Sequence, residues 1–117
     1  MQMDVSEIDG GIQHIRLSGR MDVAGTQAID LRFTALTASR RAAIVVDLAD
    51  VSFLASIGMR TLLSSAKALA MKGGRMVLLN PQPMVADALS TAGIDTLIPV
   101  HTDLGAACQA VAGVAAG

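Results

Sequence analysis

The amino-acid sequence predicts an α/β protein in which an N-terminal β-hairpin leads into a mostly parallel sheet of about five strands with about four helices. Three observations carry this prediction. Two alternating segments flank Asp9-Gly10-Gly11, residues 42–48 form a β-branched run without alternation, and later apolar runs alternate with segments of helical period. The length of 117 residues and the hydrophobic fraction of 52% suit a single domain over residues 1–117.

The hairpin is expected to pair a strand at residues 2–8 with one at 11–18. The turn is expected at Asp9-Gly10-Gly11, because glycine supplies the positive φ that a tight hairpin turn needs. Residues 42–48 then read as a strand buried on both faces, as in a parallel sheet.

A helix is predicted from Asp22 onward, because Ile29, Phe33 and Leu36 are spaced to share one helical face. The flanking apolar residues broaden that face, and these are Ala28, Leu31 and Ala35. The remaining elements are expected in this order: a helix at 56–72 stopped by Gly73-Gly74, a strand at 75–79, a helix at 83–92, a strand at 97–100 and a helix at 103–116.

Composition excludes several classes of function. The formal net charge is −1, and no Trp or Tyr is present, so direct nucleic-acid binding lacks both a basic surplus and stacking platforms. Cys108 is the single cysteine, which leaves no internal disulfide. His14 and His101 show no metal-ligand spacing with Cys108.

We also expect no membrane insertion and a cytoplasmic location. The first residues contain neither a basic segment nor an apolar one of the kind found in signal peptides. The longest aliphatic block, residues 42–46, is far shorter than a membrane-spanning helix.

Motifs of ordinary catalysis are missing. The chain has no G-x-G-x-x-G or G-x-x-x-x-G-K-[ST] phosphate loop, and residues 54–58 lack the first glycine of a G-x-S-x-G nucleophile elbow. We therefore predict a binding protein that is not an enzyme and needs no cofactor.

Ser56 is the most informative residue, because it lies where the strand at 42–48 is followed by a helix. One interpretation is an N-cap, in which the Ser56 hydroxyl accepts a backbone N–H of the first turn. The other is a phosphorylation switch, in which a phosphate at the positive end of the helix dipole changes the local charge and controls association.

Several short motifs resemble STAS domains, and together they span nearly the whole chain. Residues 17–22 match an L-x-G-x-[LM]-D pattern after the hairpin, and residues 45–60 resemble the strand and phosphorylation loop of that family. Gly73-Gly74 followed by a strand, and then the helix at 83–93, continue the resemblance.

The resemblance implies a single-domain anti-sigma factor antagonist. Such a protein binds an anti-sigma factor that is also an ATP-dependent serine kinase, which frees a sigma factor until phosphorylation of the loop serine ends the binding. The phosphoacceptor maps to Ser56. The usual D-S-[ST]-G arrangement reads Ala55, Ser56, Ile57 and Gly58 here, so the preceding Asp and the following hydroxyl are replaced.

The partner surface implied by the resemblance has seven residues, and for three of them a structural role is an open alternative. Asp22 caps the first helix or lies beside the Ser56 loop, Met59 contacts a partner or packs in the core, and Arg60 binds a partner carboxylate or is solvated. The full set is Asp22, Ala55, Ser56, Ile57, Gly58, Met59 and Arg60.

Two other functions stay open. Similar STAS domains serve as accessory subunits of lipid or ABC-type membrane transport complexes, where Ser56 would be only a cap. An acyl-transfer hydrolase would need a histidine and a carboxylate beside the Ser56 hydroxyl. The sequence does not decide between a monomer and a homodimer.

Overall fold

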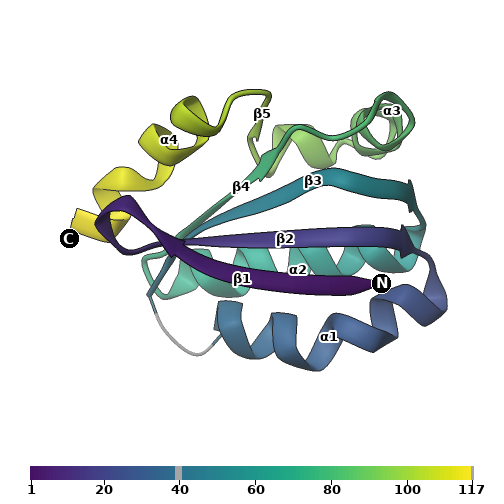
Figure 1. Cartoon of the computed structure of the whole chain (residues 1–117), viewed down its shortest axis with the longest axis horizontal. Helices are drawn as coiled ribbons and strands as arrows, with labels where there is room; N and C mark the ends of the chain where they lie inside the picture. Colours follow the sequence, from purple (N-terminus) through teal and green to yellow (C-terminus); the bar gives the residue numbers. More distant parts are fainter. Residues whose placement is uncertain (39–40, 117) are drawn as a thin grey trace.

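The computed structural model describes residues 1–38 and 41–116 and forms one sheet flanked by helices on both faces (Figure 1). Within that part of the chain the sheet has five strands in the order β1-β2-β3-β4-β5. β1 pairs antiparallel with β2, and every later pair is parallel. The strands are β1 Gln2–Ile8, β2 Ile12–Met21, β3 Ala43–Leu54, β4 Arg75–Leu79 and β5 Val100–His101. The predicted fold class is confirmed.

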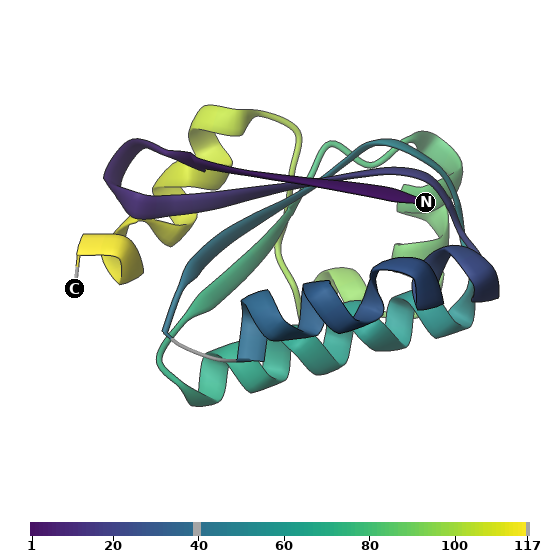
Figure 2. The same ribbon diagram turned by 60° about the horizontal axis from the view of Figure 1, so that its bottom comes forward.

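The helices lie on the two faces of the sheet as the hydrophobic pattern requires. They are α1 Val23–Ala38, α2 Ser56–Met71, α3 Pro83–Thr91 and α4 Leu104–Ala116, with short 3-10 turns η1 Asp9–Gly11 and η2 Ile94–Thr96. Figure 2 shows α1 and α2 side by side beneath one face, and α4 on the other. The main core therefore lies between the sheet and the α1–α2 layer, and a smaller cluster lies under α4.

The hairpin and several boundaries follow the predictions. β1 and β4 occupy the expected ranges 2–8 and 75–79. Gly10 and Gly11 have φ of 77° and 82°, the left-handed region that the turn was expected to need. Gly73, with φ 82°, ends α2, and its N–H donates to the Ala70 carbonyl.

The predicted end of the third strand was wrong. Residues 49–54 were expected to be a connection, yet β3 continues to Leu54. β2 also runs three residues further than predicted, so that Ser18 pairs with Asp50 and Met21 with Leu54. Buried Val51 at 0% exposure and Leu54 at 6% anchor this extension, while the polar side chains of Asp50 and Ser52 are exposed.

The last strand and one helical face also differ from the predictions. β5 is Val100–His101 instead of residues 97–100, because the N–H groups of Leu97 and Ile98 both donate to the Ile94 carbonyl and prolong the η2 turn. In α1, Phe33 is fully buried as expected, but Leu31 is 87% exposed. The apolar face of α1 is therefore narrower than its composition indicated, and Ala28 and Ala35 are exposed too.

Within the described residues, no helix is long and apolar enough to cross a membrane.

Candidate partner-binding surface

The ends of β2 and β3 bring Asp22 and Ser56 to one edge of the sheet. Met21 and Leu54 are the last paired residues of the two strands, and the Ala55 N–H donates to the Met21 carbonyl at 3.0 Å. α1 begins at Val23 and α2 at Ser56, so both helices start from this edge. We call the residues around these helix starts the Ser56 surface; they are the exposed Ser56 and Arg60 and the half-buried Asp22, Ala55 and Ile57.

Ser56 is the first residue of α2 and does not cap it, which corrects the N-cap interpretation. The N-cap is Ala55, with extended φ and ψ of −91° and 168°, and no side chain bonds to the first turn. Ser56 is exposed, and within the described chain its hydroxyl has no hydrogen-bond partner. The Ser56 hydroxyl is therefore available for reaction or for contact with another molecule.

Gly25 and Gly58 allow the first turns of α1 and α2 to approach the ends of β2 and β3 closely. A Cβ on Gly58 would lie 2.7 Å from Met21 Cγ and 2.9 Å from Leu54 Cδ1, far inside van der Waals contact. A Cβ on Gly25 would overlap the Arg20 carbonyl oxygen. Both glycines are buried, so Gly58 positions Ser56 without itself presenting a surface. Gly25 was missed at the sequence level, where it reads as an ordinary helical residue.

Asp22 caps α1, in agreement with one of its two interpretations. Its Oδ1 accepts the Gly25 N–H at 2.8 Å, and its Oδ2 lies 3.5 Å from Arg20 Nε. The Gly25 hydrogen bond first, and the Arg20 guanidinium second, hold the pKa of the Asp22 carboxyl below its ordinary value of 3.8. Arg20 also covers the Phe53 ring, with its Cζ 4.5 Å from the ring centroid. The Asp22 carboxylate is 40% exposed and therefore remains accessible at this edge.

The other predicted partner residues divide between core and surface. Met59 is half-buried and packs against the main core, so its core interpretation holds at least in part. Ala55 and Ile57 are half-buried and flank Ser56 with apolar side chains. Arg60 is exposed one turn after Ser56, and no described residue pairs with its guanidinium.

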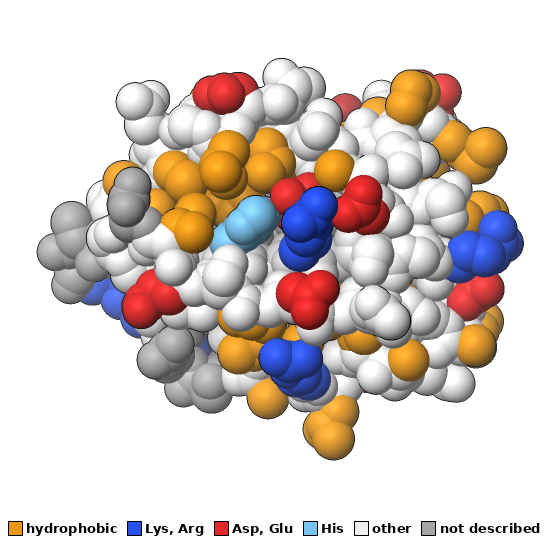
Figure 3. Space-filling model, in the orientation of Figure 1, with side chains coloured by type: hydrophobic (Ala, Val, Ile, Leu, Met, Phe, Trp, Pro, Cys, Tyr) orange, Lys and Arg blue, Asp and Glu red, His pale blue; other side chains and the backbone are white. Residues whose placement is uncertain are grey.

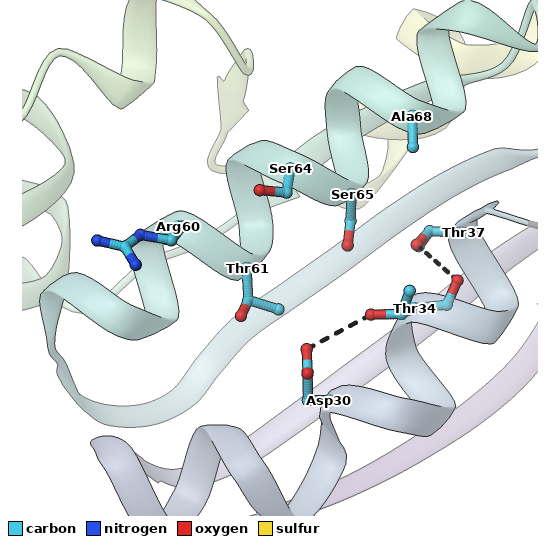
Figure 4. Close-up of a pocket in the computed structure, with 8 residues that line it drawn as sticks. All are labelled: Asp30, Thr34, Thr37, Arg60, Thr61, Ser64, Ser65 and Ala68. Carbon is cyan, nitrogen blue, oxygen red and sulfur yellow. Dashed lines mark hydrogen bonds between the residues drawn. The ribbon is translucent and has the colours of Figure 1, made fainter.

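A groove of about 390 Å³ runs between α1 and α2 and begins next to Arg60 (Figure 4). It is lined mostly by small hydroxyl residues, namely Thr34 and Thr37 from α1 and Thr61, Ser64 and Ser65 from α2, with Asp30 near one end. The sequence analysis did not identify this groove. The available signal was the recurrence of polar residues at helical spacing on both helices, at 30, 34 and 37 and at 61, 64 and 65.

The two histidines lie away from Ser56, which removes the geometry that a hydrolase would need. His14 Nε2 is 2.9 Å from Asp47 Oδ2, and both residues lie seven positions before the Met21–Leu54 pair, roughly 20 Å along the strands. His101 pairs with Leu79, which itself pairs with Asp47. Neither histidine therefore meets the Ser56 hydroxyl.

Asp47 is largely buried, as a structural role predicts, although it lies in the middle of β3 and not at its end. Besides the His14 contact it accepts the Ala49 N–H at 3.0 Å. The face of the sheet that carries this pair also carries an Arg16–Asp50 ion pair at 3.2 Å. Figure 3 shows acidic and basic side chains gathered beside a histidine on this face. The described residues contain no group of three potential metal ligands.

The STAS domain family model matches residues 5–107, most of the chain. The chain therefore belongs to the STAS domain family. A relative, BtrV of Bordetella bronchiseptica, is named as a candidate anti-sigma factor antagonist and is 26% identical over 110 residues, 94% of each chain.

Solved structures agree with this assignment. An anti-sigma factor antagonist from Mycobacterium paratuberculosis superposes with a TM-score of 0.84 at 26% identity, covering 94% of this chain and 92% of that one. The anti-sigma factor antagonist SpoIIAA in its unphosphorylated form has a TM-score of 0.76 at 22% identity, covering 93% and 96%. The SpoIIAA likeness shows the fold alone.

Proposed function

We propose that this chain, as one STAS domain over residues 1–117, is an anti-sigma factor antagonist whose Ser56 surface binds an anti-sigma factor with serine kinase activity. Phosphorylation of Ser56 then ends the binding. The family and the names of the two relatives at 26% identity support the antagonist role. The observation that carries the switch is the exposed, unbonded Ser56 hydroxyl at the start of α2, on the same edge as Asp22.

A phosphate on Ser56 would leave the fold intact and would change the charge of the surface that a partner contacts. The first helical hydrogen bond of α2 runs from the Met59 N–H to the Ala55 carbonyl, so the preceding N–H groups find no partner inside the helix and favour an anion there. Arg60 follows at i+4, about 6 Å along the helix axis, where an arginine can pair with a phosphoserine. The phosphate would thus add negative charge and engage the Arg60 guanidinium, which no described residue pairs with in the unmodified chain.

Phosphate mapping tests the acceptor. The chain is incubated with ATP, Mg²⁺ and its anti-sigma factor kinase, and the modified residue is located by mass spectrometry. We expect a single phosphate on Ser56, lost in Ser56→Ala and kept in Ser90→Ala, the same change at an exposed serine of α3. Phosphate on any other residue, or none on Ser56, would contradict the assignment.

A second candidate function is an accessory subunit of a membrane transport complex. It is favoured by one observation, the half-buried Ala55 and Ile57, which make the flanks of Ser56 more apolar than the D-S-[ST]-G arrangement of the family. Ser56 would then lie in a permanent docking surface. The two functions separate with Ser56→Asp, which should lower partner binding for a switch and leave a permanent contact intact.

A further inference from the structure

The groove between α1 and α2 contains a hydroxyl, that of Ser65, which bonds to no other group in the part of the chain that the structure describes. Ser65 is 4% exposed, and among the described residues its Oγ makes no hydrogen bond. Figure 4 shows Ser65 pointing from α2 into the groove toward Thr37. The Ser65 Oγ keeps access to the groove that it lines, so it can bond to a group that enters the groove from outside.

The α1 wall of the groove offers acceptors. The Thr34 hydroxyl donates to Asp30 Oδ1 at 3.4 Å, and the Thr37 hydroxyl donates to the Phe33 carbonyl at 3.1 Å. Because both hydroxyl protons are used, these threonines present only lone pairs to a ligand. Asp30 adds a carboxylate, which makes this wall suited to a cation or to a group rich in N–H donors.

The α2 wall of the groove also offers hydrogen-bond acceptors to a ligand with N–H donors. Thr61 and Ser65 both point into the groove, and their oxygens can accept hydrogen bonds. Arg60 lies at one end of the groove but is directed away from it, so its charge does not occupy the space beside Asp30. A guanidinium has five donors in one plane and can reach acceptors on both walls together, whereas a phosphate or carboxylate would meet the Asp30 charge.

We propose that this groove receives an arginine side chain of the partner protein, whose guanidinium binds Asp30 and the hydroxyls of Thr61 and Ser65. This inference rests on the proposed function for the identity of the partner, because the arginine is assigned to the anti-sigma factor. The groove begins one helical turn from Ser56, so a partner that covers the Ser56 surface also covers the mouth of the groove.

A titration that needs no anti-sigma factor tests the groove by itself. The full chain, labelled with ¹⁵N, is titrated with Nα-acetyl-arginine amide and separately with Nα-acetyl-citrulline amide, which has the same shape without the charge. We expect saturable shifts of the Thr34, Thr61 and Ser65 amides with the arginine probe, smaller ones with citrulline, and none in Asp30→Asn. Equal shifts with both probes, or no saturable shift at these amides, would overturn the proposal.

The binding assay with the anti-sigma factor separates this proposal from the proposed function. Asp30→Asn and Ser65→Ala should each weaken binding, Asp30→Asn by about tenfold, as loss of a hydrogen bond to a charged group predicts. Asp87→Asn, an exposed carboxylate change on α3, should leave the affinity unchanged. Wild-type binding that is unaffected by both groove variants would refute the groove and leave the antagonist role standing. No binding by the wild-type chain would instead refute the antagonist role.

Discussion

Ser56 and Asp22 come from separate parts of the sequence, and backbone pairing between β2 and β3 brings them to one edge. Each side chain there has a different role. Asp22 holds the start of α1 through the Gly25 N–H, whereas Ser56 holds nothing in place. A residue without a structural role can be modified without disturbing the fold, and this freedom is what a switch at Ser56 requires.

The lowered pKa of Asp22 predicts that part of the unfolding free energy depends on pH. Its pKa is lower in the folded chain than the ordinary value of 3.8, so the charged carboxylate stabilises the fold above that value, and this contribution disappears as the pH falls through the lowered pKa. We expect the wild type to exceed Asp22→Asn in unfolding free energy at neutral pH, with the gap closing in acid.

Urea unfolding at a series of pH values measures this difference. Asp87→Asn serves as the control for removing an exposed carboxylate from another helix. A gap between wild type and Asp22→Asn that stays constant, or widens, on acidification would show that the carboxylate charge does not hold the start of α1.

The positions of Asp22, Ser56 and Arg60 could be predicted from motif order, but the residue that caps α2 could not. Ala55 and Ser56 are adjacent, and the backbone path alone decides which of them becomes the N-cap. The α1–α2 groove escaped prediction for a related reason. Its two walls are readable as polar stripes, but only the packed structure shows that Thr34 and Thr61 face the same space.

At the scale of elements, the start of α2 depends on a close approach of the helix to both strand ends. Gly58 is where this approach is tightest, and the Ala55 N–H bond to Met21 lies beside it. The position of Ser56 is therefore set by backbone packing and not by its own side chain.

Gly58→Ala tests this packing. Alanine normally favours a helix over glycine by about 1 kcal/mol, but here the new methyl group would meet Met21 and Leu54, so we expect a net loss of about 1–3 kcal/mol. Gly113→Ala is the matched control, because a Cβ there meets nothing within 4 Å, and it should stabilise α4 by about 0.5–1 kcal/mol. Urea unfolding gives both values, and a stabilised Gly58→Ala would contradict the packing account.

The ends of helices and strands were predictable where a residue with a local backbone preference, such as glycine or proline, marks them. Glycine and proline marked the ends of α2 and the start of α3, at Gly73 and Pro83. The end of β3 had no such local signal. Asp50 and Ser52 look like loop residues, but their strand conformation comes from pairing with the prolonged β2, a long-range interaction that periodicity does not contain.

At the scale of the whole molecule, one large core carries the fold and leaves the Ser56 surface free. The core lies between the sheet and α1 and α2, and Phe33 is the largest of its fully buried side chains. The second cluster under α4 is smaller. Ser56 and Arg60 are exposed and lie outside this core, so changes at these two residues should affect binding much more than stability.

Phe33→Ala measures how far the fold depends on that core. The substitution leaves a cavity where a fully buried ring was, and we expect a loss of about 3–5 kcal/mol in unfolding free energy. Leu31→Ala, on the same helix but 87% exposed, should change stability by less than about 0.5 kcal/mol. Similar losses for the two variants would contradict the assignment of the α1 faces.

The measurement that tests the central claim most directly is the affinity of the anti-sigma factor for the unmodified chain and for the chain phosphorylated on Ser56, by titration calorimetry. We expect the phosphate to weaken binding by at least about tenfold while circular dichroism shows an unchanged fold. Equal affinities of the two forms would contradict the account, because the Ser56 surface would then not be the switch that its geometry led us to propose.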